Sequence, residues 1–229
     1  MDYREQPAPA DLTLSVRAQW ALDCGGTADE AISHQAVPDG CIELIWRTQG
    51  RSSWRGEQPA AFICGLLSRP AELRFSGDAR FTALRLWPWA ARALGLPAIS
   101  QLIDGWIPLP AHLQSPETVL ATLAEARRDA VGEAIIGADS VARIVQRSGL
   151  SPRQLQRWFA AEVGVPPRQY LRLVRFQEAF AGIQSDDASL AGHAADHGYA
   201  DQAHMAREFR ALAKAPAHAV RRKAKGPFV

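Results

Sequence analysis

The first 88 residues alternate between short apolar runs and turn-forming residues. The runs are rich in Val, Ile, Phe and Trp, and Gly, Pro and Asp separate them, as in Pro38-Asp39-Gly40. Short strands with frequent turns are typical of a β-sandwich or a small barrel. We therefore expect strands at residues 14–22, 41–48, 61–67, 71–76 and 80–87.

After Trp87 the apolar residues are spaced as in helices. Residues 89–94 are expected to form one or two helical turns that end at Gly95. Ser115-Pro116-Glu117-Thr118 offers a cap, a proline at the first position and an acid in the first turn, so a helix should begin there. Its apolar spacing continues to about Ile136.

From Ser140 onward nearly the whole chain has helical spacing, with Gly and Pro between the helices. The predicted fold class is therefore an α+β multidomain protein. It has a β-rich sandwich or barrel-like domain at residues 1–112, which would sense a signal or dimerise. A connecting helix follows at 113–137, and an all-α domain occupies 138–229.

Two segments of the all-α part share one plan, fifty residues apart. Residues 141–159 read VARIVQRSGLSPRQLQRWF, and residues 190–209 read LAGHAADHGYADQAHMAREF. Each has a short helix that ends near a glycine, a tight turn, a capping residue (Ser151 or Asp201) and a second helix. An Arg lies six positions after each cap and a Phe eight positions after it. The pattern predicts one helix-turn-helix unit used twice.

The second helix of each unit, at about 151–163 and 201–212, combines an apolar stripe with a polar face. Arg and Gln dominate the polar face, and their forked donors match guanine and adenine edges in the major groove. Any one of these residues alone could belong to a solvated helix surface, but the repeated pattern favours DNA binding. The candidate DNA-binding residues are Arg153, Gln156, Arg157, Gln202, Ala203, Arg207 and Arg210.

The segment between the units, PPRQYLRLVRFQEAFAGIQ, starts with proline at a helix N-terminus and is apolar around most of its circumference. A helix of its length spans about 27 Å at 1.5 Å per residue. Successive turns of the major groove lie about 34 Å apart. A stiff helix of this length could hold two recognition helices on one face of a duplex.

Residues from about 138 to 222 resemble the DNA-binding domain of AraC-type (arabinose-operon regulator) proteins. The resemblance is carried by LSPRQLQRWFAAEVGVPPRQYLRLVRFQEA and GYADQAHMAREFRAL. The resemblance implies base contacts by six of the candidate DNA-binding residues, namely Arg153, Gln156, Arg157, Gln202, Ala203 and Arg207. Ala203 cannot hydrogen-bond through its side chain, so its contact would be apolar, for example to a thymine methyl. The text HQAVPDGCIELIWRT, with AAFICGLLSRPAEL after it, is similar to the front half of short AraC-type regulators.

Two positions depart from the AraC-type pattern. The family usually ends with Gly, an apolar residue and Ser-Pro, whereas this chain has Lys214-Ala215-Pro216-Ala217. A last helix is still expected after Pro216. Val145 stands where a small alanine is usual, so we expect slightly looser packing of the first unit.

Charge is divided unevenly along the chain. From Ala138 onward there are 14 Lys and Arg against 8 Asp and Glu, a net of +6, and the rest of the chain has a net of −4. A basic half suggests an anionic partner, although the tail RRKAK contributes much of the excess. The N-terminus is acidic and Pro-rich rather than a basic stub before an apolar run, and no stretch is long and apolar enough to cross a membrane. We therefore expect a cytoplasmic protein without a membrane partner.

Four residues of the front part, Cys24, His34, Cys41 and Cys64, raise the question of a metal or redox site. Their spacings of 10, 7 and 23 match no pair-plus-pair zinc signature. A cysteine next to isoleucine is usually a small buried hydrophobe. We therefore expect no metal and no cofactor.

The tryptophans of the front part allow two interpretations. They could line an aromatic ligand pocket, or they could belong to the core of a small sandwich, which is the commoner case. The residues concerned are Trp20, Trp46, Trp54, Trp87 and Trp89.

The favoured function is a sequence-specific transcription regulator modulated through its front domain, and not an enzyme. Double-stranded DNA is the expected partner, and RNA polymerase, a small-molecule effector and a second copy of the chain are further candidates. One alternative is an alkyl-transfer DNA-repair enzyme with an attached AraC-type module. No cysteine lies in a Pro-Cys-His context, and no phosphate loop or nucleophile elbow occurs. The other alternative is a constitutive DNA binder whose front domain only dimerises.

Overall fold

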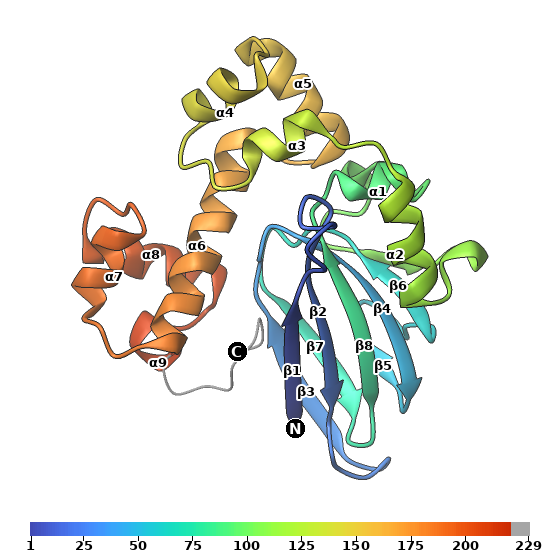
Figure 1. Ribbon diagram of the computed structural model, residues 1–229. Helices are drawn as coiled ribbons and strands as arrows, with labels where there is room; N and C mark the ends of the chain where they lie inside the picture. The colour runs from blue at the N-terminus through green and yellow to red at the C-terminus, as the bar shows by residue number, and fades with distance from the viewer. Residues whose placement is uncertain (221–229) are drawn as a thin grey trace.

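The computed structural model describes residues 1–220 and consists of a strand-rich N-terminal part followed by a helical C-terminal part (Figure 1). The basic tail noted in the sequence, from Arg221 onward, lies outside the described residues. No helix among residues 1–220 is long and apolar enough to cross a membrane.

Two antiparallel sheets form the N-terminal part. Within residues 1–220, the larger sheet has the strand order β1-β2-β8-β4-β6-β9, and the smaller has the order β3-β7-β5. The strands of the larger sheet are β1 (Asp2–Pro7), β2 (Val16–Asp23), β8 (Arg80–Leu86), β4 (Ile42–Gln49), β6 (Ala61–Cys64) and β9 (Trp106–Pro108). Those of the smaller sheet are β3 (Ala31–Ala36), β7 (Ala71–Ser76) and β5 (Ser52–Ser53).

The larger sheet is buried on both faces, because alternate residues of a strand point to opposite sides. On one face, Trp20, Ile45 and Phe81 pack with Phe75 of the smaller sheet. The opposite face packs against helices through Leu44, Trp46, Leu84 and Leu86. Covering of both faces explains why the central strands β4 and β8 read as nearly continuous apolar runs.

All five predicted strand regions contain a strand, but four further strands were not predicted. The strand β1 is mostly polar and exposed because it lies at the sheet edge. Its backbone pairs with β2, Tyr3 packs against Trp20, and Glu5 pairs with Arg85. The predicted strand at 61–67 ends at Cys64, where Gly65 lies against another segment. A Cβ at Gly65 would be 1.9 Å from the carbonyl oxygen of Leu102, so only glycine fits.

The predicted helix from Ser115 to Ile136 is wrong as one continuous element. The structure has two helices, α2 (Pro116–Glu125) and α3 (Ala130–Ile135), with extended backbone at Ala126. Asp129 starts the second helix, because its side chain accepts hydrogen bonds from the backbone N–H groups of Val131 and Gly132.

The apolar side of α2 is buried within its own chain, at Val119 and Leu123, so that side is not free to form a dimer surface. The domain boundaries that the sequence predicts at residues 112 and 138 stay proposals.

The remaining helices follow the predicted order. Glycine at a positive φ of 69° ends the first helix of the first unit at Gly149, and Gly198 has φ 68° just beyond the corresponding helix of the second. A short helix follows Pro216, as expected. The bounds are α1 (Ala90–Ala93), α4 (Val141–Ser148), α5 (Pro152–Glu162), α6 (Pro167–Ser185), α7 (Leu190–Asp196), α8 (Gln202–Leu212) and α9 (Ala217–Val220), with 3-10 turns η1 (Ile99–Gln101) and η2 (Ala111–Leu113).

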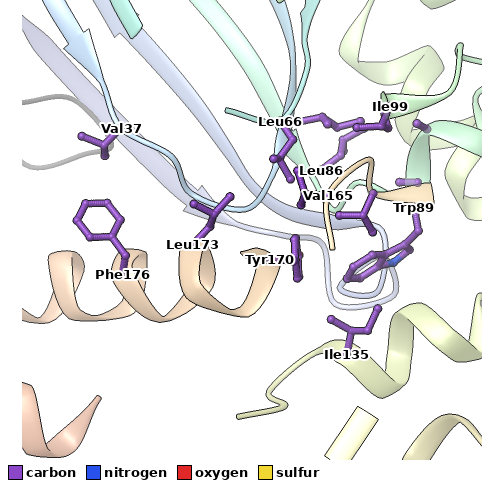
Figure 2. Close-up of a cluster of buried hydrophobic side chains, with 14 of the residues drawn as sticks. Val37, Leu66, Leu86, Trp89, Ile99, Ile135, Val165, Tyr170, Leu173 and Phe176 are labelled. Atoms are coloured by element: carbon purple, nitrogen blue, oxygen red, sulfur yellow. The ribbon is translucent and has the colours of Figure 1, made fainter. Parts of the chain in front are cut away.

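One continuous apolar core joins the two parts of the chain. Figure 2 shows Tyr170 and Leu173 of α6 directed toward the N-terminal part, with Trp89 and Val165 beside Tyr170. Tyr170 and Leu173 are fully buried. The long helix α6 is therefore held by the N-terminal part as well as by the two helix-turn-helix units it connects (Figure 1).

Candidate nucleic-acid interface

The helix α5 is fixed at its start and along one side. Ser151 accepts a hydrogen bond from the backbone N–H of Gln154, and the Gln154 side chain accepts one from the backbone N–H of Ser151, which completes the predicted capping box. Leu155 and Phe159 are fully buried beneath the helix. On the other side Arg153, Gln156 and Arg157 are exposed, as the sequence predicts.

The helix α8 has the same construction. Asp201 caps it by accepting a hydrogen bond from the backbone N–H of His204. Its apolar stripe is buried at Met205, Phe209 and Leu212. The predicted residues Gln202, Ala203, Arg207 and Arg210 are exposed.

Four arginines are exposed on these two helices. Within residues 1–220, Arg153, Arg157, Arg207 and Arg210 make no ion pair and no side-chain hydrogen bond. Each guanidinium keeps its five donors free for an external acceptor. The two faces therefore display unneutralised, bidentate donors, which suit phosphates and base edges.

The structure identifies a buried residue of α8 that the sequence argument missed. Glu208 accepts hydrogen bonds from Nε of Arg172 at 2.8 Å and from Nη2 of Arg175 at 3.1 Å. Arg175 in turn lies over the ring of Tyr199, 4.8 Å from its centroid. These contacts bind α8 to α6. The available signal was an acid between Met205 and Phe209, at a helical position that should be apolar.

The first unit also contacts the N-terminal part directly. The ring of Trp158 lies 6.1 Å from that of Trp89, measured between centroids. Arg92 pairs with Glu162 at 3.4 Å across the same boundary. The position of α5 therefore depends on α1 and the residues around it.

An internal cavity lies between the two sheets of the N-terminal part. Its cavity volume is about 50 Å³, and the wider space around it opens to solvent. Trp20 and Trp54 line it, whereas Trp46 and Trp89 lie buried in the core that joins the two parts. The tryptophans thus divide between the two interpretations offered by the sequence.

A buried charge cluster borders this cavity. Nε of Arg85 lies 2.9 Å from Oδ2 of Asp39 and 3.0 Å from Oε1 of Glu43, and its Nη1 lies 2.8 Å from Oε2 of Glu5. Trp20 adds a hydrogen bond from its indole N–H to Glu43, at 3.1 Å. Burial raises the pKa of Glu43, while Arg85 opposes that rise, and the facing carboxylates raise the pKa of Arg85.

The loop between β3 and β4 touches both the cavity and the DNA-binding part. Val37, Asp39 and Cys41 line the cavity, and Gly40 faces α6. A Cβ at Gly40, where φ is 78°, would lie 3.0 Å from Cγ2 of Val174. Nearby, the side-chain amide of Gln35 donates to the carbonyl oxygen of Ala213, at 2.7 Å.

The cysteines do not gather into a site. Cys41 and Cys64 line the cavity, Cys24 is buried elsewhere, and all three are free thiols. Burial raises the pKa of each thiol above its ordinary value, which disfavours the reactive thiolate needed for alkyl transfer. Among residues 1–220 no three His, Cys, Asp or Glu side chains are placed to hold a metal.

Comparisons with known proteins agree with this two-part architecture. Residues 120–223 match the family described as a helix-turn-helix domain, and residues 4–108 match a domain of unknown function, DUF6597. No curated protein matches the chain.

The solved structures similar to this chain include ToxT from Vibrio cholerae. The 1.65 Å ToxT structure has 9% identity and a TM-score of 0.50, covering 96% of this chain and 98% of that one. ToxT bound to (E)-4-(8-methylnaphthalen-1-yl)but-3-enoic acid has 9% identity and a TM-score of 0.49, with the same coverage. The first similarity shows a shared fold.

The residues that match the helix-turn-helix domain contain the capped helices α5 and α8 and the long helix between them. The strand-rich part is matched independently of them. The chain therefore combines an N-terminal DUF6597 domain with a C-terminal AraC-type helix-turn-helix domain, the DNA-binding module of transcription regulators.

Proposed function

We propose that this protein is a sequence-specific transcription regulator that inserts α5 and α8 into successive major grooves of one duplex. The observation that carries the proposal is the pair of capped helices whose exposed faces hold arginines without an ion-pair or hydrogen-bond partner in residues 1–220. The side chains proposed to contact DNA are Arg153, Gln156, Arg157, Gln202, Ala203, Arg207 and Arg210. RNA polymerase and a second copy of the chain stay expected partners.

The connecting helix supports joint use of the two units. With 19 residues, α6 is about 28 Å long at 1.5 Å per residue. This is close to the roughly 34 Å between successive major-groove turns, and the side chains at either end make up the difference. Burial of α6 against the N-terminal part and the ion pairs of Glu208 make the spacing rigid.

The direct test selects tightly bound duplexes from a random pool with the full chain. A protein that contacts bases with both α5 and α8 should select two short sequence elements about one helical turn apart. Arg157→Ala should relax selection in one element and Arg207→Ala in the other. Arg74→Ala is the matched control, because Arg74 is an exposed arginine of β7 without an ion pair among the described residues. Selection of a single element would overturn the two-groove proposal.

We further propose that the N-terminal part modulates DNA binding through a small molecule in its cavity. The loop at residues 37–41 supports this, because one side lines the cavity and the other lies against Val174 and Tyr170 of α6. An occupant that displaces the loop would press on the helix that holds the two recognition helices. The small molecule could shift the balance between two arrangements of this loop only if it contacts them differently.

A cavity-filling variant tests this modulation without knowledge of the natural occupant. Leu73 of β7 lines the cavity, and its neighbour Glu72 is exposed. Leu73→Trp should change the affinity for a selected duplex, whereas Glu72→Trp should leave it unchanged. Equal affinities for Leu73→Trp, Glu72→Trp and wild type, with all three folded, would favour a constitutive DNA binder.

A further inference from the structure

The walls of the internal cavity are apolar and aromatic, but its polar lining is one-sided. Aromatic rings come from both sheets and from the segment between β5 and β6. The rings are those of Trp20, Trp54, Phe62, Phe75 and Phe81. The acidic side chains of Asp39 and Glu43 reach the same space, and no Lys, Arg or His among residues 1–220 lines it.

The acids are only partly neutralised by the protein. A single guanidinium, that of Arg85, faces Asp39, Glu43 and Glu5, and its Nε is shared between the first two. Arg17 lies nearby, where its Nη1 donates to the backbone carbonyl of Asp39 at 3.2 Å rather than to a carboxylate. The cluster thus places three carboxyl groups against two guanidinium groups beside an apolar space.

A second polar group points to a ligand independently of the acids. Gln58 is only 3% exposed and lines the cavity. Its side-chain amide makes no hydrogen bond to any other residue within 1–220. A ligand with an N–H donor in the cavity would offer a hydrogen bond to its carbonyl oxygen.

We propose that this cavity binds an apolar organic cation, with an aromatic or aliphatic body among the rings and a protonated nitrogen directed at Asp39, Glu43 and Gln58. Carboxylates and an amide oxygen are hydrogen-bond acceptors for such a nitrogen. Trp20 and Trp54 can add cation–π attraction. An anion of the same shape would meet two carboxylates and no lining cation. This inference rests on the proposed modulation and names its ligand class.

Three probes that differ only in their polar end test the proposal on the full chain. They are 4-phenylbutylammonium, 4-phenylbutanol and 4-phenylbutyrate, with calorimetry and tryptophan fluorescence as readouts. The ammonium probe should bind about tenfold or more tighter than the carboxylate, because a charged hydrogen bond in a buried site contributes that much. Equal binding of the two charged probes, preference for the carboxylate, or no binding of any probe would overturn the ligand class.

Variants locate the effect in the cavity. Glu43→Gln should remove most of the preference for the ammonium probe, and Glu125→Gln on the exposed side of α2 should keep it. Because Glu43→Gln also takes a partner from Arg85, Gln58→Leu provides a variant that breaks no ion pair. It should weaken binding of the ammonium probe several-fold and binding of the alcohol less, because the charged donor makes the stronger hydrogen bond to the amide oxygen. Unchanged selectivity in folded Gln58→Leu and Glu43→Gln would refute the assignment.

The same preparations separate this inference from the proposed function. DNA binding without a probe reports on the recognition helices alone. Intact DNA binding with no ammonium preference would refute only the ligand class. Absent DNA binding in the wild type would refute the proposed function itself.

Discussion

The carboxylate of Glu208 lies 2.8 Å from Nε of Arg172 and 3.1 Å from Nη2 of Arg175, which joins α8 to the long helix α6. The carboxylate side chain is only 7% exposed, while the two arginines are 41% and 33% exposed. The acid is thus a buried structural anchor on a helix whose opposite face is exposed.

Glu208→Ala should destabilise the second unit. Loss of the buried acid leaves two arginines without a partner, but their partial exposure to water limits the cost to about 1–3 kcal/mol, below the range for a fully buried pair. Urea unfolding measures the change. Glu178→Ala on the exposed side of α6 is the matched control and should be near neutral. Equal stability of the two variants would show that Glu208 does not anchor α8.

Replacement of Arg157 or Arg207 by alanine should leave thermal stability nearly unchanged, because neither side chain has a protein partner among the described residues. Loss of a good base contact costs roughly 1–3 kcal/mol, or about five- to two-hundred-fold in affinity. The loss should concentrate at one or two base pairs of the selected duplex. Equal weakening on all sequences would instead identify a phosphate contact.

Replacement of Phe159 or Phe209 by alanine should have the opposite profile. Both rings are fully buried, and such a deletion costs roughly 3–5 kcal/mol through the cavity it leaves. Melting temperature should fall and DNA binding should be lost with it, whatever the sequence. If Arg157→Ala lowered stability as much as Phe159→Ala, the assigned orientation of α5 would be incorrect.

The affinity for duplex DNA should fall steeply with salt. Each phosphate neutralised by an arginine releases condensed counterions, so several contacts give a loss of orders of magnitude between about 50 and 200 mM salt. If Arg210 contacts a phosphate, Arg210→Ala should reduce the slope of log affinity against log salt concentration. If Arg210 contacts a base, the slope should stay the same. A flat titration of the wild type would exclude the phosphate-contact model.

The three thiols should react slowly with iodoacetamide in the folded protein at neutral pH and rapidly in urea. Burial raises the pKa of each thiol, so the reactive thiolate is scarce in the native state. Because the folded pKa lies above the unfolded one, this contribution to stability is present at neutral pH and is lost as pH rises through the ordinary thiol range, near 9. Rapid native alkylation of Cys41 or Cys64 would revive the alkyl-transfer alternative.

The sequence by itself determined the helical half of this protein and its candidate contacts with DNA. Caps such as Ser151, the glycine at 149 and the apolar stripes are local signals, read within a few residues of one another, and they predicted α5 and α8 almost to the residue. Amphipathic spacing alone placed Arg157 and Arg207 on the exposed side, because a helix face follows from its period.

Only the tertiary structure decided which distant residues meet. The polar strand β1 exists because β2 pairs with it. Glu208 is buried because α6 brings two arginines to it. The cavity, its acidic border and the loop against α6 depend on pairing between strands far apart in the chain. Sequence periodicity contains no information on such pairing, because it describes the faces of elements and not their neighbours.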